Sequence, residues 1–236
     1  KKESRYSIEI QAILTVLGRR NISYDLEGQY LNLRKAHLPG LTLTGNFTNV
    51  DLRGATLSEA NFVNATLENV NFIGADLTKA GFSNVNLTNV DLRDACLELT
   101  SFEKVKLANS YLDGANLNRA RMQEANLRKV KLSGAFLYAA DLTAADLEEV
   151  DFRFAHLRGA IFRRTISEMA LPQMSDFDPD GILGSIDLGK TDFRGSNVTV
   201  EQVKLASKWN TAIYDDAFLQ QVESSNYQIP ESGAET

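Results

Sequence analysis

A strict spacing of five residues is the feature that most constrains this 236-residue chain. From Phe47 to Phe162 a large apolar residue stands at every fifth position, 24 times in succession: Leu sixteen times, Phe seven times and Met once. Two positions earlier stands Ala or Val, except at Gly45, Thr100 and Ser110. A helix face repeats near every 3.6 residues and a strand face every two, so neither element explains the period.

A unit of two inward and three outward residues is too short for its own strand and turn, so each unit must be one side of a coil. Short extended sides closed by tight turns would let stacked coils hydrogen-bond at about 4.8 Å spacing. Glycines at positions 54, 74, 114 and 134 and phenylalanines at 62, 82, 102 and 162 recur at multiples of twenty. This recurrence predicts four sides per coil and a square column.

The residue two positions after each large apolar residue is often Gly or Asn, as at Gly54 and Asn69. Both types tolerate the positive φ that the second central residue of a type II turn requires. Upstream, Leu33, Leu38 and Leu43 follow the same pattern but join Phe47 at a spacing of four. We therefore expect a coil shortened by one residue near Gly45, with a local kink.

The units ADLTKAGF, ANLNRARM, ANLRKVKL and AADLTAADL resemble the A(D/N)LXX unit of the pentapeptide repeat family. The similarity covers residues 31–165 and resumes at 186–198. The resemblance implies an all-β solenoid, a right-handed quadrilateral β-helix. The flanking segment IQAILTVLGRRN and the Trp-containing C-terminal segment also resemble pieces that accompany the repeats in bacterial members.

Both ends of an open solenoid expose apolar surface and unpaired backbone groups, so we expect helical caps. Residues 1–30 are predicted to form a capping helix and lead-in, and 199–223 a second capping helix. Residues 166–185 are expected to loop out of the column, and 224–236 to be a disordered tail. The apolar stripes are Ile10, Ile13, Leu14 and Leu17 for the first helix and Leu205, Trp209, Ala212 and Ile213 for the second.

The net charge of −6 is unevenly distributed. Residues 31–165 hold 16 Lys and Arg against 15 Asp and Glu, whereas residues 166–236 hold 4 against 12. A neutral body without a basic stripe argues against nucleic-acid binding. No apolar run approaches the roughly 18 residues of a membrane helix, so we expect no membrane insertion by this segment. The expected compartment is the cytoplasm, although the chain could also be the soluble part of a longer, membrane-anchored protein.

A candidate calcium loop lies in the predicted excursion. Asp176, Asp178, Asp180 and Asp187 fall where a D-x-D-x-D-G-x5-E loop places its ligands. Against calcium, the last ligand is Asp instead of Glu, and no helix can be predicted after it. The alternative is ordinary Asp-Pro-Asp-Gly turn chemistry. We expect no metal and no cofactor.

The sequence offers little for catalysis. Cys96 lies outward with no histidine near it in the predicted stacking, and Asp141, Asp146 and Asp151 occupy outward positions suited to solvation and turn bonding. We predict that the protein is not an enzyme.

An exposed aromatic group is the candidate recognition surface: Phe136, Tyr138, Phe154 and His156 are expected to lie together by the twenty-residue stacking. The excursion could pack over it, or it could dock a partner.

The predicted function is a non-enzymatic scaffold or protein–protein interaction module with an unidentified protein partner. One alternative comes from the resemblance, since some family members mimic DNA and bind a type II topoisomerase; the near-neutral body disfavours it. A calcium-responsive binding module is another alternative. A homodimer through the C-terminal helix is a further prediction.

Overall fold

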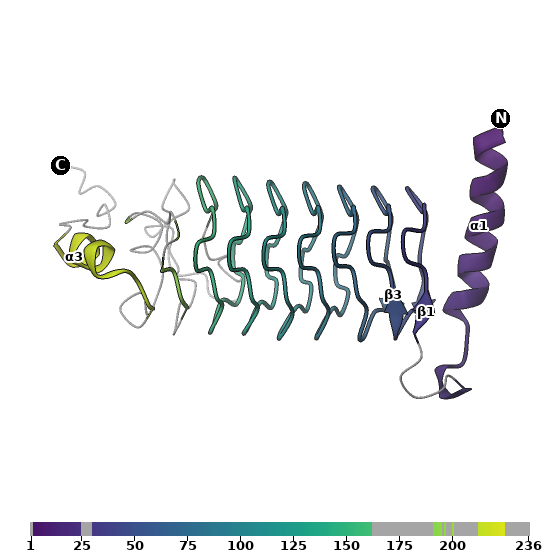
Figure 1. Ribbon diagram of the computed structural model, residues 1–236, viewed down its shortest axis with the longest axis horizontal. Coiled ribbons are helices and arrows are strands. Elements are labelled where there is room, and N and C mark those ends of the chain that lie inside the picture. The colour runs from purple at the N-terminus through teal and green to yellow at the C-terminus, as the bar shows by residue number, and fades with distance from the viewer. Residues whose placement is uncertain are drawn as a thin grey trace, which may run out of the picture.

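The computed structural model describes residues 2–24, 30–161, 191–194, 196, 200 and 212–224. These residues build a column of stacked coils with a helix at each end (Figure 1). The elements are α1 (Lys2–Gly18), the 3-10 helix η1 (Ile22–Tyr24), strands β1 (Leu31–Asn32), β2 (Gly45–Asn46), β3 (Val50–Asp51) and β4 (Ala65–Thr66), and α3 (Asp216–Ser224).

Parallel backbone pairing joins each coil to the next. β1 pairs with β3 and β2 with β4, and single parallel bridges continue the pattern along the column. Asn71 pairs with Asp91 and Asp91 with Tyr111, so partners lie twenty residues apart. Four units of five residues therefore complete one coil, which confirms the predicted four-sided column.

The first coil is one residue shorter, as predicted. Thr42 pairs with Asn61, nineteen residues on, whereas Gly45 pairs with Ala65, twenty residues on. Gly45 has a φ of 87°, and a Cβ there would lie 2.3 Å from the carbonyl oxygen of Gly18. Glycine is required at this position because the end of α1 approaches the backbone too closely for any side chain.

The core consists of columns of identical repeat positions. In one column the Phe62 and Phe82 rings stack with centroids 4.3 Å apart, and those of Phe82 and Phe102 with centroids 5.3 Å apart. The two polar exceptions among the smaller inward residues are satisfied: the Thr100 and Ser110 hydroxyls donate to backbone carbonyls at 2.9 and 2.8 Å. A buried hydroxyl with such a partner avoids most of its desolvation cost.

Where a unit carries Asp or Asn before its large apolar residue, that side chain holds the following turn. Its Oδ1 accepts a hydrogen bond from the backbone N–H two residues later, as Asn71 does from Ile73 at 3.0 Å and Asp141 from Thr143 at 2.9 Å. The turn then carries a positive φ, near 60° at most corners. A short side-chain acceptor before the large apolar residue therefore supports the turn where it occurs, although units with Tyr111 or Phe136 at this position stack in the same way.

Helix α1 packs on the first coil through three of the four predicted stripe residues. Leu14 is 2% exposed and Ile10 and Leu17 pack against the core, whereas Ile13 is 58% exposed. Gln11 faces the coil instead: its side chain accepts from the Thr42 N–H at 2.8 Å and donates to the Thr42 carbonyl at 2.6 Å. The prediction for Ile13 was wrong because the open coil edge requires a polar partner.

The C-terminal end contains a repeat unit that we did not predict. Asp151 pairs with Asp192, which lies in the final repeats predicted at 186–198, and Asp192 pairs with Ile213 in the unpredicted unit. Tyr214 then occupies the large apolar position, where it is 6% exposed and its ring stacks on that of Phe193 at 5.7 Å. The predicted continuous helix over 199–223 is therefore wrong for residues 212–215.

Helix α3 begins only at Asp216, and its apolar residues Phe218, Leu219 and Val222 pack against the core. Among the predicted stripe residues, Leu205 and Trp209 lie outside the described residues. Neither helix in the described part of the chain is long and apolar enough to cross a membrane.

Candidate functional site

The four residues predicted to form an aromatic patch lie on two neighbouring coils. Phe136 and His156 occupy the same position in consecutive coils, and their rings stack 4.7 Å apart at an angle of 5°. Tyr138 follows on the same side of the column as Phe136, and Phe154 lies at the corner that precedes His156. We call these residues the aromatic patch: Phe136, Tyr138, Phe154 and His156.

The patch residues are exposed. Phe136, Tyr138 and Phe154 are 44, 48 and 64% accessible to solvent, and His156 is also exposed. Phe154 has a φ of 59°, in the left-handed region that a bulky side chain rarely occupies. Phe154 stands two residues after the large apolar Phe152, at the corner position that takes a positive φ. The sequence already showed a bulky residue at that position, but we did not use it to predict strain.

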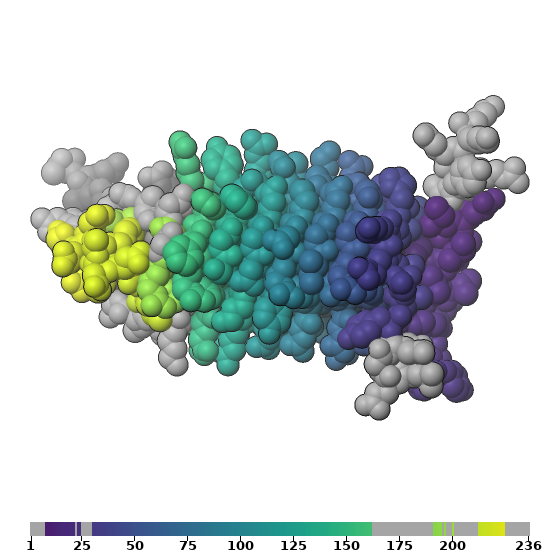
Figure 2. Space-filling model, viewed as in Figure 1, coloured from purple at the N-terminus to yellow at the C-terminus, as the bar shows by residue number. Residues whose placement is uncertain are grey.

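Whether the excursion covers this patch is a prediction about residues outside the described part. The chain leaves the described coils after Ile161, on the side that follows His156 around the coil, and returns at Thr191. Figure 2 shows the outer surface of the stacked coils built by residues 30–161.

The candidate calcium ligands Asp176, Asp178, Asp180 and Asp187 also lie outside the described residues. In the described part, no group of three or more His, Cys, Asp or Glu side chains could hold a metal ion.

The residues considered for catalysis have structural roles in the coils. The Sγ of Cys96 lies 3.2 Å from the hydroxyl of Thr78. Asp141 and Asp146 each accept from the backbone N–H two residues later, at 2.9 and 3.2 Å. The Oδ1 of Asp151 accepts hydrogen bonds from both the backbone N–H and the side-chain Nε of Arg153. These contacts match the predicted turn-bonding role.

Paired Asp and Arg side chains recur on one side of the column, which we did not predict. Each Asp accepts hydrogen bonds from the backbone N–H and from the guanidinium of the Arg two residues later. The pairs come from the strings VDLR, VDLR, VDFR and TDFR: Asp51–Arg53, Asp91–Arg93, Asp151–Arg153 and Asp192–Arg194. The repeated D-x-R string was the available signal.

These pairs change the acidity of their carboxyl groups. The side-chain hydrogen bond from Arg53 lowers the pKa of Asp51 below its usual value. For Asp151, burial opposes ionisation, but the hydrogen bonds from the Arg153 side chain and backbone outweigh it and lower the pKa. Both groups are therefore ionised near neutral pH, and each charge is matched by its own arginine.

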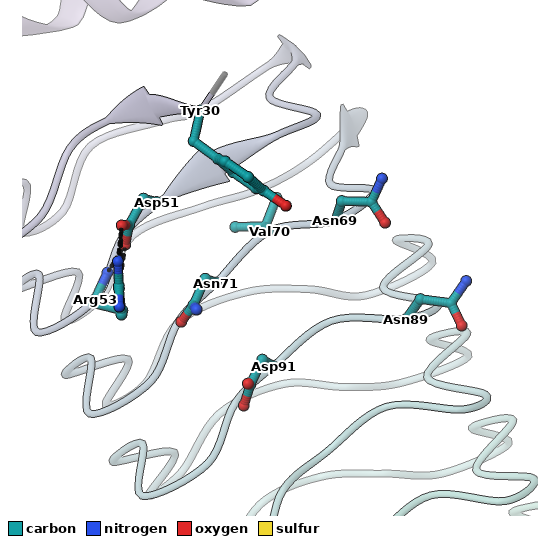
Figure 3. Close-up of a pocket in the computed structure, with 8 residues that line it drawn as sticks. All are labelled: Tyr30, Asp51, Arg53, Asn69, Val70, Asn71, Asn89 and Asp91. Atoms are coloured by element: carbon teal, nitrogen blue, oxygen red, sulfur yellow. Dashed lines mark hydrogen bonds and ion pairs between the residues drawn. The ribbon is translucent and has the colours of Figure 1, made fainter. Parts of the chain in front are cut away.

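A groove of about 370 Å³ lies between two of these pairs, and Figure 3 shows its lining. Tyr30 overhangs it from the segment before the first coil, which is why repeat-based reasoning missed the site. We call it the polar groove; its lining residues are Tyr30, Asp51, Arg53, Asn69, Val70, Asn71, Asn89 and Asp91.

The two surfaces suit different ligands. Exposed aromatic rings suit the apolar side chains of a protein partner, whereas the amides and carboxylates of the groove suit a small polar molecule.

Comparison with protein-family models finds pentapeptide repeats in eight copies, at residues 46–84, 67–103, 100–137 and 137–166. Together these ranges span residues 46–166, about half of the chain. No curated protein matches the sequence.

Several solved structures are similar. HetL, a pentapeptide repeat protein involved in heterocyst differentiation regulation from the cyanobacterium Nostoc sp. strain PCC 7120, is 25% identical, with 86% of this chain and 90% of HetL covered and a TM-score of 0.34. QnrB1, a plasmid-mediated fluoroquinolone resistance protein, is 16% identical, with 83% and 96% covered and a TM-score of 0.36. A pentapeptide repeat protein from the Arabidopsis thaliana thylakoid lumen is 25% identical, with 48% and 74% covered and a TM-score of 0.31.

Proposed function

Because the chain belongs to the pentapeptide repeat family, whose members form right-handed quadrilateral β-helices and are generally not enzymes, we propose that it is a scaffold that binds a protein partner. The proposed contact surface is the aromatic patch. The observation that carries this proposal is the clustering of three aromatic rings, each 44 to 64% exposed, on two neighbouring coils.

A rigid repeat column suits recognition because two inward columns maintain the fold while outward residues can vary. Aromatic side chains supply much of the binding energy in protein interfaces. Phe154 also occupies a left-handed corner, where Asn or Gly would adopt the positive φ with less strain. This cost supports a role for the ring in contact with a partner, since the ring adds nothing to the buried core.

The DNA-mimic alternative requires a surface of uncompensated negative charge. In the described coils the carboxylates of Asp51, Asp91 and Asp151 are each matched by an arginine on the same side of the column. This pairing, added to the near-neutral charge of residues 31–165, weighs against mimicry. A calcium-responsive module stays a prediction about residues outside the described part.

The ends of the column support further parts of the proposal. α1 covers the first coil through Leu14 and Gln11, and α3 packs Val222 against the last one, so we assign both helices capping roles. Since α3 directs Phe218 and Leu219 to the core as well, a homodimer through this helix would rest on its polar outer face. The homodimer and the cytoplasmic compartment stay predictions.

The test is affinity capture from a bacterial lysate with quantitative mass spectrometry, using a Phe136→Ala, Phe154→Asn double variant. Phe154→Asn removes the ring but keeps a residue that tolerates positive φ. The matched control is Leu99→Asn with Tyr111→Ala, because Leu99 is a second exposed apolar residue at a left-handed corner and Tyr111 is 50% exposed on another side.

We expect the patch variant to lose its specific partner by about tenfold or more, as hot-spot aromatics do, while the control retains it. Equal capture by both variants, or no specific capture by the unaltered protein, would contradict the proposal.

A further inference from the structure

The polar groove extends across three successive coils, with Tyr30 at one end of it (Figure 3). Asp51, Asn71 and Asp91 contribute to it from the same position in those coils, because the coils stack in register at twenty residues. Its volume of about 370 Å³ lies within the range of small-molecule sites. The groove is therefore large enough for a ligand of one or two rings.

The negative charges of the groove are balanced by the positive charges of neighbouring arginines. The Nε atoms of Arg53 and Arg93 lie 2.9 Å from the Oδ1 atoms of Asp51 and Asp91. Asn71 stands between these two pairs, so the floor carries no unmatched charge. An anion would meet two carboxylates, and a cation would compete with two arginines already bound to them. The groove consequently favours a neutral ligand.

The free hydrogen-bonding groups of the groove are amides. The Oδ1 of Asn71 accepts from the Ile73 N–H at 3.0 Å, which leaves its Nδ2 to donate. The Nδ2 of Asn69 donates to Asn49 at 3.3 Å, which leaves its Oδ1 to accept. The Asn89 side chain has no partner in the described part of the chain. A row of donors and acceptors of this kind matches hydroxyl groups, each of which both donates and accepts.

An apolar platform completes the groove. Tyr30 is 55% exposed, and its ring extends over Val70 with the hydroxyl at its outer end (Figure 3). A pyranose has apolar C–H faces and a rim of hydroxyls, so it could stack on such a ring while its rim meets the amides. We propose that the polar groove binds a neutral oligosaccharide, with one sugar on Tyr30 and its hydroxyls on Asn69, Asn71 and Asn89.

The test is saturation-transfer NMR, followed by titration calorimetry, on the whole chain. The probes are neutral cello-, xylo-, malto- and N-acetylchito-oligosaccharides, with glucose 6-phosphate and glucosamine as charged comparisons. Because the groove is open on one side, we expect a dissociation constant on the order of 0.1–1 mM for the best probe.

Three variants localise the binding. Tyr30→Ala removes the platform, and we expect a loss of about fivefold or more in affinity. Asn71→Asp replaces a donor with the residue that occupies the same position at Asp51 and Asp91, so it should fold normally and bind more weakly. Tyr111→Ala, on the same side of the column but outside the groove, should bind like the unaltered chain.

Several results would overturn the inference. These are no transfer to any neutral probe at millimolar concentration, stronger binding of a charged comparison, or unchanged binding by Tyr30→Ala. Binding of an extended peptide at the groove residues without any saccharide signal would also refute it. Each outcome is independent of partner capture by the aromatic patch, so the two proposals can fail separately.

Discussion

Phe154 and Leu99 hold a backbone conformation that costs a bulky residue about 1–2 kcal/mol relative to Asn or Gly. Their φ values are both 59°, like those of the asparagine corners Asn84 and Asn109 at 63° and 60°. The fold tolerates them because hydrogen bonds on both sides determine the corner: the Phe154 N–H donates to the Arg194 carbonyl at 2.9 Å.

Replacing Phe154 by Asn should therefore stabilise the protein by about 1 kcal/mol. The measurement is the midpoint of urea unfolding, with Phe154→Ala as the control, because Ala removes the ring without easing the left-handed φ. Equal midpoints for the Asn and Ala variants would show that strain at this corner is not the cause.

The Asp–Arg pairs predict how stability depends on pH. The pKa values of Asp51, Asp151 and Asp192 are lowered in the folded protein, with Arg53 the main cause for Asp51. For Asp151 and Asp192, burial acts in the opposite direction but is outweighed by Arg153 and Arg194. A lowered folded pKa adds stability above the unfolded value of about 3.9, and this stability disappears as pH falls through the folded value.

We expect the free energy of unfolding to fall below about pH 4, and to fall less in a triple variant with Asn at positions 51, 151 and 192. Asn keeps the turn bond to the backbone N–H, as Asn71 shows, so the variant should retain its fold. Chemical unfolding between pH 7 and pH 2 tests this prediction. Parallel pH profiles for the two proteins would contradict it.

At the scale of elements, α1 shows that an apolar pattern predicts a helix more reliably than it predicts which residues of the helix pack. Four apolar residues fitted one stripe, yet Ile13 points to solvent and Gln11 faces the coil. The stripe was predicted from apolar burial alone. The first coil, however, also exposes backbone N–H and C=O groups that have no neighbouring coil to pair with.

Leu14→Ala should destabilise the protein by about 2–5 kcal/mol because it leaves a cavity between α1 and the first coil. The neighbouring Ile13→Ala should change stability by no more than about 0.5 kcal/mol, since its side chain is 58% exposed. Thermal unfolding of the two variants compares them directly. A similar loss from both would mean that Ile13 also packs on the first coil.

At the scale of the whole molecule, the column has two ends that its own repeats cannot close. Stacking satisfies each coil only through its neighbours, so the first and last coils depend on α1 and α3. Without α1, the backbone N–H and carbonyl of Thr42 would lose their partner, the Gln11 side chain.

Removing residues 1–24 should therefore cause association through the exposed end of the column. Light scattering after size exclusion should show larger species that the full chain lacks, increasing with protein concentration. Gln11→Ala in the full chain is a milder comparison that unpairs the Thr42 backbone but keeps Leu14 in place. A truncated protein that scatters like the full chain would argue against the capping role.

Much of this molecule could be predicted because the repeat is local. A period of five sets two inward columns, the period of twenty sets four sides, and the shift at Gly45 was visible in the spacing of Leu43 and Phe47. The stacking of Phe136 on His156 followed from the same register, since residues twenty apart lie above one another.

What the amino-acid sequence determined by itself was every feature that depends on neighbours at a regular spacing: the column, its corners, its core and the stacking of Phe136 on His156. Only the tertiary structure decided where irregular segments meet the column. It placed Gln11 on the open edge, Tyr214 on Phe193 and Tyr30 beside Val70 in the lining of the polar groove, positions that no fixed spacing sets. Such contacts depend on how the chain closes in three dimensions, which no repeat period encodes.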